Sequence, residues 1–454
     1  MAYQSINPFS GEKGIVHETI SGDELGGIIE SCSEAQQNWK KRAVEERAGF
    51  AGSLAEILEN RSDEYGRIIT SEMGKPYTQA VAEVKKCALA CRYYESGAAG
   101  FLRPEPRESS QGVTMLRYDP LGIVLAVMPW NFPFWQVIRC IVPALVSGNG
   151  VLLKHASNVP ASALAIEEAV REAGFPEPLF RNLFVTHEQV SSIIEHRKVS
   201  SVSLTGSNIA GARIASAAGS AVKRCVLELG GSDPFIVFPD ADIKSSVEGA
   251  ITGRFQNNGQ SCIATKRIYL HKDIFNEFSS LFVERVKSLK VGDPMDPEVY
   301  IGPVVNRSAA EELAEQVTKS VKMGARLLCG KGRPEEKGSL FSPTVLADVA
   351  DDSPVATEET FGPVVPLFSF SDYNEVISRV NSSRFGLGAS VWTGNSDLAM
   401  QAATDIESGT VTINGFTRSD PAVPFGGIKE SGYGRELSDL GLYEFVNIKS
   451  VTHF

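Results

Sequence analysis

One cysteine stands in a polar segment that is suited to a reactive thiol. Cys262 closes the run Gln-Asn-Asn-Gly-Gln-Ser-Cys that begins at Gln256. The other six cysteines lie mainly in apolar or helical runs, as packing cysteines do. A free thiol is mostly protonated near neutral pH, so a nucleophilic cysteine needs a partner, and the sequence shows no histidine nearby. Cys262 is therefore either a covalent catalyst with a distant partner or an incidental loop thiol.

Two other residues have side chains suited to acyl chemistry. Glu228 lies in Leu-Glu-Leu-Gly-Gly, and apolar surroundings raise the pKa of a carboxyl group, which suits a general base. The alternative is a structural carboxylate that accepts backbone N–H groups. Asn131 lies in Pro-Trp-Asn-Phe-Pro, where a fixed side-chain amide could donate to a developing oxyanion. Its alternative is a local Asx turn.

Two segments could bind a nucleotide, although neither G-x-G-x-x-G nor a P-loop is present. Gly206 and Ser207 open an expected helix whose free N–H groups could bind phosphate, but Gly-Ser is also an ordinary helix cap. Lys154 and Ser157 follow a short buried strand. Such a lysine is either a solvated surface group or a ligand of a ribose. A carboxylate nearby would favour the free 2′-hydroxyl, whereas a neutral serine tolerates a 2′-phosphate.

Alternating strands and helices must position these residues. The expected strands are 112–119, 121–128, 150–154, 182–185, 201–204 and 222–227, and the expected helices are 134–146, 160–173, 187–195 and 207–218. This alternation implies β-α-β units and a parallel sheet that binds ligands at the carboxyl ends of its strands. A second α/β domain follows, with a strand over 235–238 and helices over 274–289 and 309–323. The segments 24–60 and 80–94 are expected to be outer helices without a role in the site.

The composition excludes several classes of protein. The 454 residues carry 44 Lys and Arg against 55 Asp and Glu, and this net charge of −11 argues against a nucleic-acid partner. The seven cysteines form no disulfide or zinc pattern, so no metal site is predicted. The N-terminus has no signal-peptide features, and the longest apolar run, 123–128, is too short to span a membrane. A cytoplasmic protein with free thiols is expected.

Taken together and in order, the motifs resemble those of the NAD(P)-dependent aldehyde dehydrogenase superfamily, and within it the chain is most similar to short bacterial succinate-semialdehyde dehydrogenases. The matching segments are 6–8, 72–76, 129–133, 205–207, 228–231, 259–262, 359–363 and 424–427. The resemblance implies a Rossmann-like parallel-sheet cofactor domain (1–107 and 119–230) and an α/β catalytic domain (231–430). It also implies a small β oligomerisation arm (108–118 and 431–454) that makes homodimers or homotetramers.

The resemblance implies a role for each matching residue. Cys262 matches the nucleophile and Glu228 the general base for deacylation. Asn131 matches one half of an oxyanion hole, whose other half is the Cys262 N–H. The residues that match cofactor contacts are Trp130, Lys154, Ser157, Gly206, Ser207, Leu229, Glu359 and Phe361, of which Glu359 and Phe361 match the positions that hold the nicotinamide ribose and ring.

Two departures from the family pattern carry information. Many members have Lys-Pro-Ser-Glu where this chain has Lys-His-Ala-Ser from Lys154 to Ser157. Because the carboxylate is gone, NADP is the expected cofactor, with NAD possible but weaker. Longer succinate-semialdehyde dehydrogenases carry Arg and a second Cys where this chain has Gln256 and Ala264. One carboxylate anchor is thus missing, and a local disulfide switch at Cys262 is not expected.

The expected substrate is a small aldehyde with a distal carboxylate. Arg139 matches a carboxylate-binding arginine of the subfamily, and the alternative is a surface or interface arginine. Ser419 is a second candidate anchor, and Trp135 and Phe425 are candidates for the apolar walls.

The predicted function is NADP-preferring oxidation of succinate semialdehyde to succinate through a Cys262 thiohemiacetal and thioester. Two alternatives stay open. The chain could be an aldehyde dehydrogenase for another small aliphatic or aromatic aldehyde, or a cofactor-free cysteine hydrolase that uses the same Cys262 and Glu228.

Overall fold

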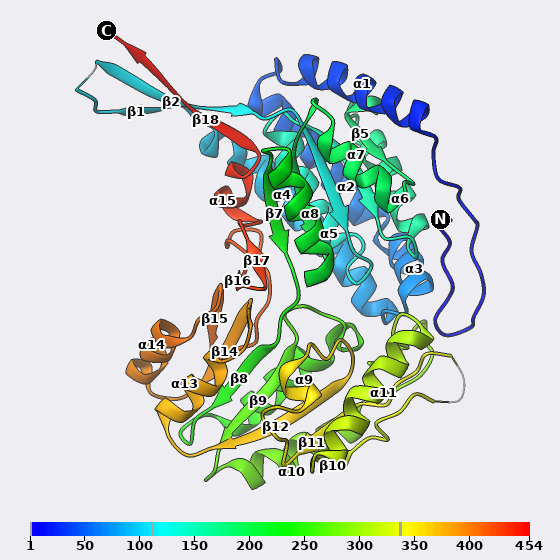
Figure 1. Ribbon diagram of the computed structural model, residues 1–454, viewed down its shortest axis with the longest axis vertical. Coiled ribbons are helices and arrows are strands. Elements are labelled where there is room, and N and C mark those ends of the chain that lie inside the picture. Colours follow the sequence, from blue (N-terminus) through cyan, green and yellow to red (C-terminus); the bar gives the residue numbers. More distant parts are fainter. Residues whose placement is uncertain (1, 111, 336–337) are drawn as a thin grey trace.

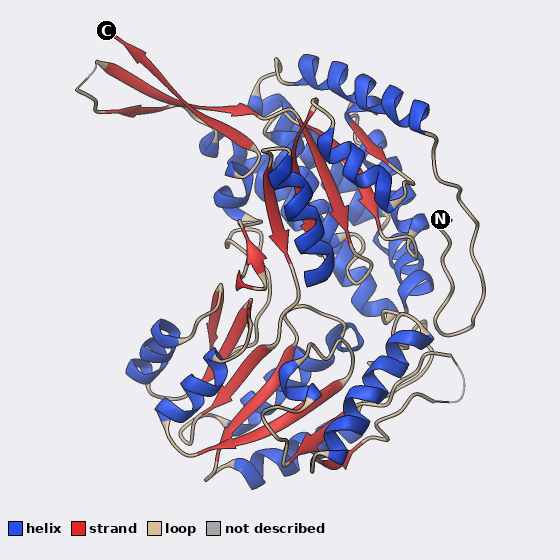
Figure 2. Cartoon of the chain, in the orientation of Figure 1, coloured by secondary structure: helices blue, strands red, loops and turns tan. Residues whose placement is uncertain are grey.

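Two α/β bodies and a projecting antiparallel ribbon form the molecule, as the computed structural model shows (Figure 1). The structure describes residues 2–110, 112–335 and 338–454. Helices lie on both faces of the sheet in each body (Figure 2). The predicted fold class, α/β with a parallel-sheet domain, is confirmed.

The first body is built on a six-stranded sheet with the order β17-β7-β6-β3-β4-β5. Its strands are β3 (Ile123–Met128), β4 (Gly150–His155), β5 (Phe180–Asn182), β6 (Val199–Thr205), β7 (Arg224–Glu228) and β17 (Gly432–Tyr433). All neighbours run parallel except β17, which pairs antiparallel with β7. The carboxyl ends of β3, β4, β6 and β7 therefore meet at one edge, as the sequence predicts.

Helices cover this sheet. They are α1 (Gly22–Trp39), α2 (Val44–Asn60), α3 (Ser62–Met73), α4 (Tyr77–Phe101), α5 (Trp135–Val146), α6 (Pro160–Glu172), α7 (His187–Glu195), α8 (Asn208–Ser220) and α15 (Ser438–Tyr443), with the 3-10 turn η1 (Glu177–Leu179). Local signals fix several boundaries. Pro160 occupies the first turn of α6, and the Thr186–Gln189 capping box begins α7 at the predicted residue.

Helix α5 is buried along its whole length, because it packs between α4 and the sheet. Its sequence is accordingly apolar almost throughout. It follows the Pro-Trp-Asn-Phe-Pro segment at the end of β3, and its residues Gln136 and Arg139 line a cavity.

The second body contains a seven-stranded sheet with the order β10-β11-β12-β9-β8-β14-β15. Its strands are β8 (Asp233–Val237), β9 (Thr265–His271), β10 (Arg326–Cys329), β11 (Thr344–Ala347), β12 (Val364–Phe370), β14 (Gly388–Trp392) and β15 (Thr410–Ile413). Its helical segments are α9 (Ile243–Phe255), η2 (Gln256–Gly259), α10 (Phe275–Lys287), α11 (Arg307–Lys322), α12 (Pro354–Thr357), α13 (Tyr373–Asn381) and α14 (Ser396–Asp405). Only the β10–β11 pair is antiparallel in this sheet.

The projecting ribbon is an antiparallel sheet of β1 (Glu105–Arg107), β2 (Val113–Pro120) and β18 (Val446–His453). It differs in extent from the predicted arm over 108–118 and 431–454. The segment after 431 first contributes β17 to the six-stranded sheet and then α15, which contacts α5. A further short pair joins β13 (Phe385–Gly386) to β16 (Ile428–Lys429). Position 111, inside the predicted arm, lies outside the described residues.

Two local predictions differ from the structure. The helical pattern over 24–60 divides into α1 and α2, and the strand expected over 182–185 is β5 at 180–182. Exposed residues 40–43 separate α1 from α2, whereas Leu183 and Val185 remain buried after β5 has ended. Hydrophobic periodicity alone does not reveal such breaks.

Candidate active site

The loop that carries Cys262 has an unusual backbone. Asn257 and Asn258 have φ of 56° and 57°, and Gly259 has φ of 73°. Asparagine tolerates this left-handed region better than most residues. A Cβ at Gly259 would lie 2.5 Å from the carbonyl oxygen of Gly362, so this position requires glycine. The turn presses the nucleophile loop closely against the segment after Glu359.

Side-chain amides hold this loop in place. Asn257 Nδ2 donates to the carbonyl oxygens of Asn131 and Gln260, both at 2.8 Å. Asn258 Nδ2 donates to the carbonyls of Gly74 and Pro303, at 2.9 and 2.8 Å. The strained turn is thus stabilised by contacts with distant segments, as is common at functional sites.

Asn131 belongs to the same network. Its Nδ2 donates to the Gln260 carbonyl at 3.1 Å, and its Oδ1 accepts from Gln136 Nε2 at 3.1 Å. These long-range contacts take the place of the local Asx turn considered above. An amide nitrogen carries two hydrogens, so the second remains available for an oxyanion beside Cys262.

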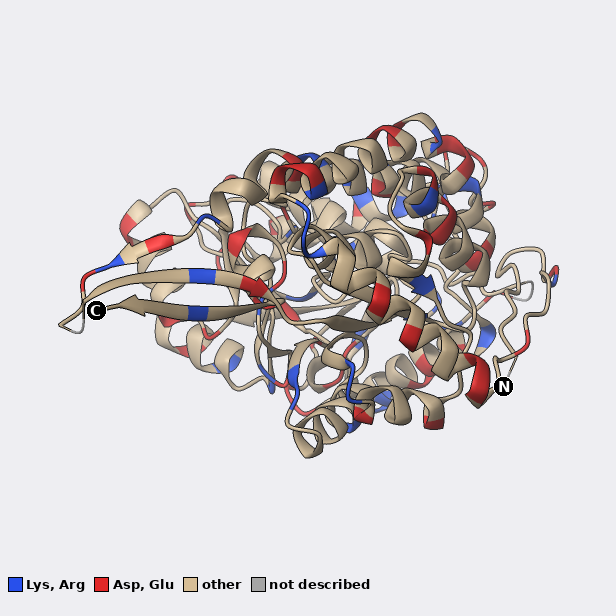
Figure 3. Cartoon of the chain, turned by 90° about the horizontal axis from the view of Figure 1, so that it is seen from above, with Lys and Arg blue, Asp and Glu red and all other residues tan. Residues whose placement is uncertain are grey.

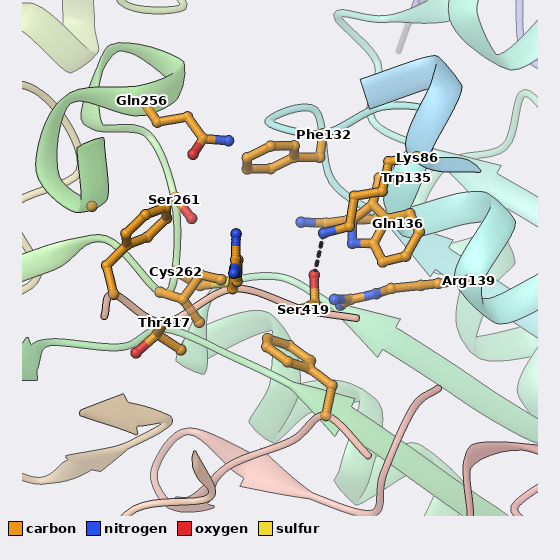
Figure 4. Close-up of a pocket in the computed structure, with 15 residues that line it drawn as sticks. Lys86, Phe132, Trp135, Gln136, Arg139, Gln256, Ser261, Cys262, Thr417 and Ser419 are labelled. Carbon is orange, nitrogen blue, oxygen red and sulfur yellow. Dashed lines mark hydrogen bonds between the residues drawn. The ribbon is translucent and has the colours of Figure 1, made fainter. Parts of the chain in front are cut away.

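Cys262 stands where two cavities meet. One is lined by residues of α4, α5, the nucleophile loop and the loop over 416–419 (Figure 4). The other is lined by residues at the carboxyl ends of β3, β6 and β7, together with Glu359 and Phe361. Only Cys262 and Gln136 line both. A thiol in this position can reach reactants that arrive from either side.

Lys266 is a charged partner of this loop that the sequence did not reveal. Its Nζ donates to the carbonyl oxygens of Ser261 and Cys262, each at 2.7 Å, and lies 2.9 Å from Glu359 Oε1. The lysine is buried, so its charge is screened little by solvent. Burial raises the pKa of the Cys262 thiol to about 11, and the positive charges of Lys266 and Arg139 oppose this rise.

Glu228 is the last residue of β7. It is not among the described residues that line either cavity. Both of its carboxylate oxygens are buried without a hydrogen-bond partner in the described part of the chain, so the structural alternative, a carboxylate bonded to backbone N–H groups, does not apply. Burial, reinforced by the neighbouring Glu436, raises the pKa of the Glu228 carboxyl well above its usual value. An unpartnered carboxylate of raised pKa has the properties of a general base.

The second cavity has the features of a nicotinamide site. Trp130 and Phe361 meet edge to face with ring centroids 5.7 Å apart, and Glu359 Oε1 accepts from the Gly231 N–H at 3.1 Å. The lining residues are Pro129, Trp130, Asn131, Gln136, Thr205, Gly206, Ser207, Leu229, Gly230, Cys262, Glu359 and Phe361. Six of the eight predicted cofactor residues are therefore brought together here. Ser207 also caps α8, because its Oγ accepts from the Ala210 N–H at 3.3 Å.

The other two predicted cofactor residues, Lys154 and Ser157, lie outside the described lining of this cavity. Lys154 is the penultimate residue of β4 and is 7 % exposed. Burial lowers its pKa, and no carboxylate among the described residues opposes this shift. A buried ammonium group without a counter-ion fits an anionic ligand, which the phosphates of a dinucleotide would supply.

The first cavity is lined by several positively charged side chains. Its lining includes Lys86, Arg139 and Arg418, and none of the lining residues, all of them described, is Asp or Glu. Along the chain as a whole, acidic and basic residues are interspersed, as the colours of the ribbon in Figure 3 show. Helix α4 supplies Lys86, so the expectation that the segment 80–94 has no role in the site is wrong.

The four predicted substrate residues, Arg139, Trp135, Ser419 and Phe425, all line this cavity. Arg139 is buried, which excludes a surface arginine. Its Nε lies 2.5 Å from Glu436 Oε2, so its charge is already paired. Lys86 Nζ donates to Ser419 Oγ at 2.7 Å (Figure 4).

Sequence reasoning missed Gln136, Lys86 and Lys266. Each comes from a regular element in which its neighbours are ordinary core or surface residues, so only the packing of distant segments reveals its place. The described residues contain no group of three or more His, Cys, Asp or Glu that could hold a metal ion. Within the same residues, no helix has the length and apolar character needed to cross a membrane.

Comparison with known proteins agrees with this geometry. The chain is 42 % identical over 454 residues to succinate-semialdehyde dehydrogenase [NADP(+)] 1 of Mycobacterium tuberculosis, with 99 % of each protein covered. It is 44 % identical to the succinate-semialdehyde dehydrogenase [NADP(+)] of Mycobacterium avium, covering 99 % of this chain and 96 % of the relative.

Solved structures show the same likeness. A succinic semialdehyde dehydrogenase of Streptococcus pyogenes in complex with NADP+ superposes with a TM-score of 0.97 at 38 % identity, covering 99 % of both chains. The succinate-semialdehyde dehydrogenase of Burkholderia pseudomallei gives 0.96 at 31 %, covering 99 % and 94 %. The profile of the aldehyde dehydrogenase family matches residues 1–451, and the chain belongs to this family.

Proposed function

We propose that the chain oxidises succinate semialdehyde to succinate with NADP as the preferred cofactor. The observation that carries this proposal is the position of Cys262 between two cavities, one lined by cations and one by the residues expected to hold nicotinamide. The names of the relatives in Mycobacterium and Streptococcus support the same substrate and cofactor.

The charge of the first cavity supports a substrate with a distal carboxylate. A chain with a net charge of −11 places three basic side chains and no carboxylate around this space. Phe132, Trp135 and Phe425 supply apolar surface for a short carbon chain. An uncharged aldehyde would leave the partly buried Lys86 without a counter-ion, which is unfavourable.

In the proposed mechanism, the Cys262 thiolate attacks the aldehyde carbon. The Asn131 side-chain amide and the Cys262 N–H stabilise the oxyanion of the thiohemiacetal. A bound nicotinamide cofactor supplies the acceptor for the hydride. Cys262 then holds the acyl group as a thioester, and Glu228 takes a proton from the water that hydrolyses it. Acylation of Cys262 followed by hydrolysis of the thioester replaces one difficult step by two easier ones.

The cofactor would be held by the residues around the second cavity and at the end of β4. Trp130, Leu229 and Phe361 offer apolar surface to the ring, and Glu359 offers a carboxylate to ribose hydroxyls. Lys154 offers a positive charge to a 2′-phosphate, and Ser157 leaves that phosphate without a repelling carboxylate.

A panel of aldehydes with and without a distal carboxylate, assayed with NADP and NAD, tests the proposal. We expect reduced nicotinamide to form fastest with succinate semialdehyde and NADP, and Cys262→Ala to abolish the signal. A preference for an uncharged aldehyde would replace succinate semialdehyde by another substrate. Ester hydrolysis with no nicotinamide reduction for any aldehyde would indicate the cysteine hydrolase.

Oligomerisation through the projecting ribbon is part of the proposal. Val113, Ile448, Val451 and Phe454 place apolar side chains on its exposed surface. An exposed apolar ribbon favours association with a second copy, and a homodimer or homotetramer is the expected form. Light scattering at assay concentrations measures it. The seven free cysteines support a cytoplasmic location.

A further inference from the structure

The first cavity contains three cations, and the structure distinguishes which of them is free to bind a substrate carboxylate. Arg139 is the least available. Its guanidinium pairs with buried Glu436, its Nη2 donates to Thr205 Oγ1 at 3.2 Å, and it lies 5.0 Å from the centroid of the Phe425 ring. An arginine whose charge is neutralised by a buried carboxylate attracts a second carboxylate only weakly.

Lys86 has comparable contacts with a hydroxyl group and an aromatic ring, but it differs from Arg139 in having no carboxylate partner among the described residues. Its Nζ donates to Ser419 Oγ and lies 4.2 Å from the centroid of the Trp135 ring. These contacts orient the ammonium group and leave hydrogens for an anion. Arg418 is exposed and lies over Phe416, so solvent screens its charge.

The positions of Lys86 and Cys262 suit a short substrate that has an aldehyde at one end and a carboxylate at the other. In Figure 4, Lys86 and Trp135 enter the cavity from one side, and Cys262 enters from the other. We propose that Lys86, together with Ser419, binds the distal carboxylate and thereby selects aldehydes that carry one. This inference rests on the proposed function and assigns its carboxylate selectivity to a residue of α4 instead of to Arg139.

Lys86 would make this selectivity depend on pH. Burial, followed by the nearby positive charge of Arg139, lowers the pKa of Lys86 to about 8, although Cys87, Glu83 and Asp420 oppose the shift. Lys86 is therefore charged below about pH 8 and loses its charge as the pH rises through this value. Arginine would not titrate in this range.

Succinate semialdehyde and butanal, which have the same four-carbon chain, test the proposal. The measured quantity is the ratio of their kcat/KM values, from which the ionisation of Cys262 cancels. We expect Lys86→Met to lower this ratio about tenfold to hundredfold, as for a lost charged hydrogen bond, with butanal oxidation changed less than about threefold. In the wild type the ratio should fall above pH 8.

Two variants serve as controls. Lys85→Met removes the adjacent exposed lysine of α4 and should leave the ratio unchanged. Lys86→Arg should retain most of the preference for succinate semialdehyde over butanal, and the ratio should no longer fall above pH 8. This result tests the proposal even if the methionine variant does not fold. An unchanged ratio in Lys86→Met, or equal losses with both aldehydes, would overturn the assignment while leaving the function intact. A wild type that does not prefer succinate semialdehyde would overturn the proposed function itself.

Discussion

Lys266 and Glu359 form an ion pair, with Nζ and Oε1 2.9 Å apart, directly behind the nucleophile. The same ammonium group donates to the Cys262 carbonyl, while Glu359 lines the cavity expected to hold nicotinamide. One side chain thus joins the nucleophile loop to the cofactor side of the site. Its positive charge also favours the Cys262 thiolate.

Replacement of Lys266 by Met is therefore expected to reduce the reactivity of Cys262. Without the buried charge, the pKa of the Cys262 thiol should rise further. A rise of about one unit in this pKa would slow alkylation by iodoacetamide at pH 8 about tenfold. Lys266→Arg should retain most of the rate. The exposed Lys272→Met is the matched control. A pH profile of alkylation identical to that of the wild type would show that Lys266 acts on the backbone alone.

The cofactor preference depends on Ser157 and Lys154. Ser157→Glu places a negative charge where the 2′-phosphate of NADP is expected, so the ratio of kcat/KM for NADP to that for NAD should fall at least about tenfold. Ser157→Ala should change this ratio little. Lys154→Met should weaken NADP more than NAD, which steady-state kinetics with both cofactors would measure. Retention of the NADP preference in Ser157→Glu would place the phosphate elsewhere.

Much of the site could be predicted from sequence because several of its residues occupy positions with a local signature. Lys154 lies near the end of a short apolar strand, and Ser207 caps the helix that follows another strand. Cys262 stands in a polar loop. Parallel-sheet topology then brings the strand ends together. Lys86 has no such signature, because its helix contacts the loop that carries Ser419 across 333 residues of sequence.

The state of Arg139 was equally inaccessible to sequence reasoning. Its match to a carboxylate-binding arginine predicts a substrate contact, and Arg139 lines the first cavity, but its partner Glu436 lies almost 300 residues later. Whether a cation is free or already paired depends on tertiary packing. Sequence spacing carries no information on this point.

Glu228→Gln is expected to separate the two halves of the reaction. Glutamine has nearly the same shape but cannot take a proton, so steady-state turnover should fall about a hundredfold or more while a burst of reduced nicotinamide persists. In the wild type, kcat should decline at low pH because Glu228 must lose its proton to act as a base. Since the pKa of Glu228 is raised, this decline should occur at a higher pH than for an ordinary carboxylate. This decline of kcat at low pH should be absent in the variant. Exposed Glu188→Gln is the control. Loss of the burst together with turnover would assign Glu228 to an earlier step.

The buried His155 should make folding sensitive to acid. Its Nδ1 accepts from the Ala156 N–H at 2.9 Å, and its Nε2 lies 2.9 Å from the Pro133 carbonyl, which joins β4 to the segment that carries Asn131. Burial lowers the pKa of His155 to about 4 from an ordinary value of 6.5. Between these values the unfolded chain binds a proton that the folded chain does not, so stability falls as the pH decreases.

This single group should lower the free energy of unfolding by about 3 kcal/mol between pH 6.5 and pH 4, and the contribution is absent above pH 6.5. Urea denaturation at several pH values measures it. His155→Gln should make the stability less steeply dependent on pH in this range, even where packing losses lower it throughout. His187→Gln, at the exposed start of α7, should retain the wild-type slope. Equal slopes for His155→Gln and the wild type would mean that acid acts through other groups.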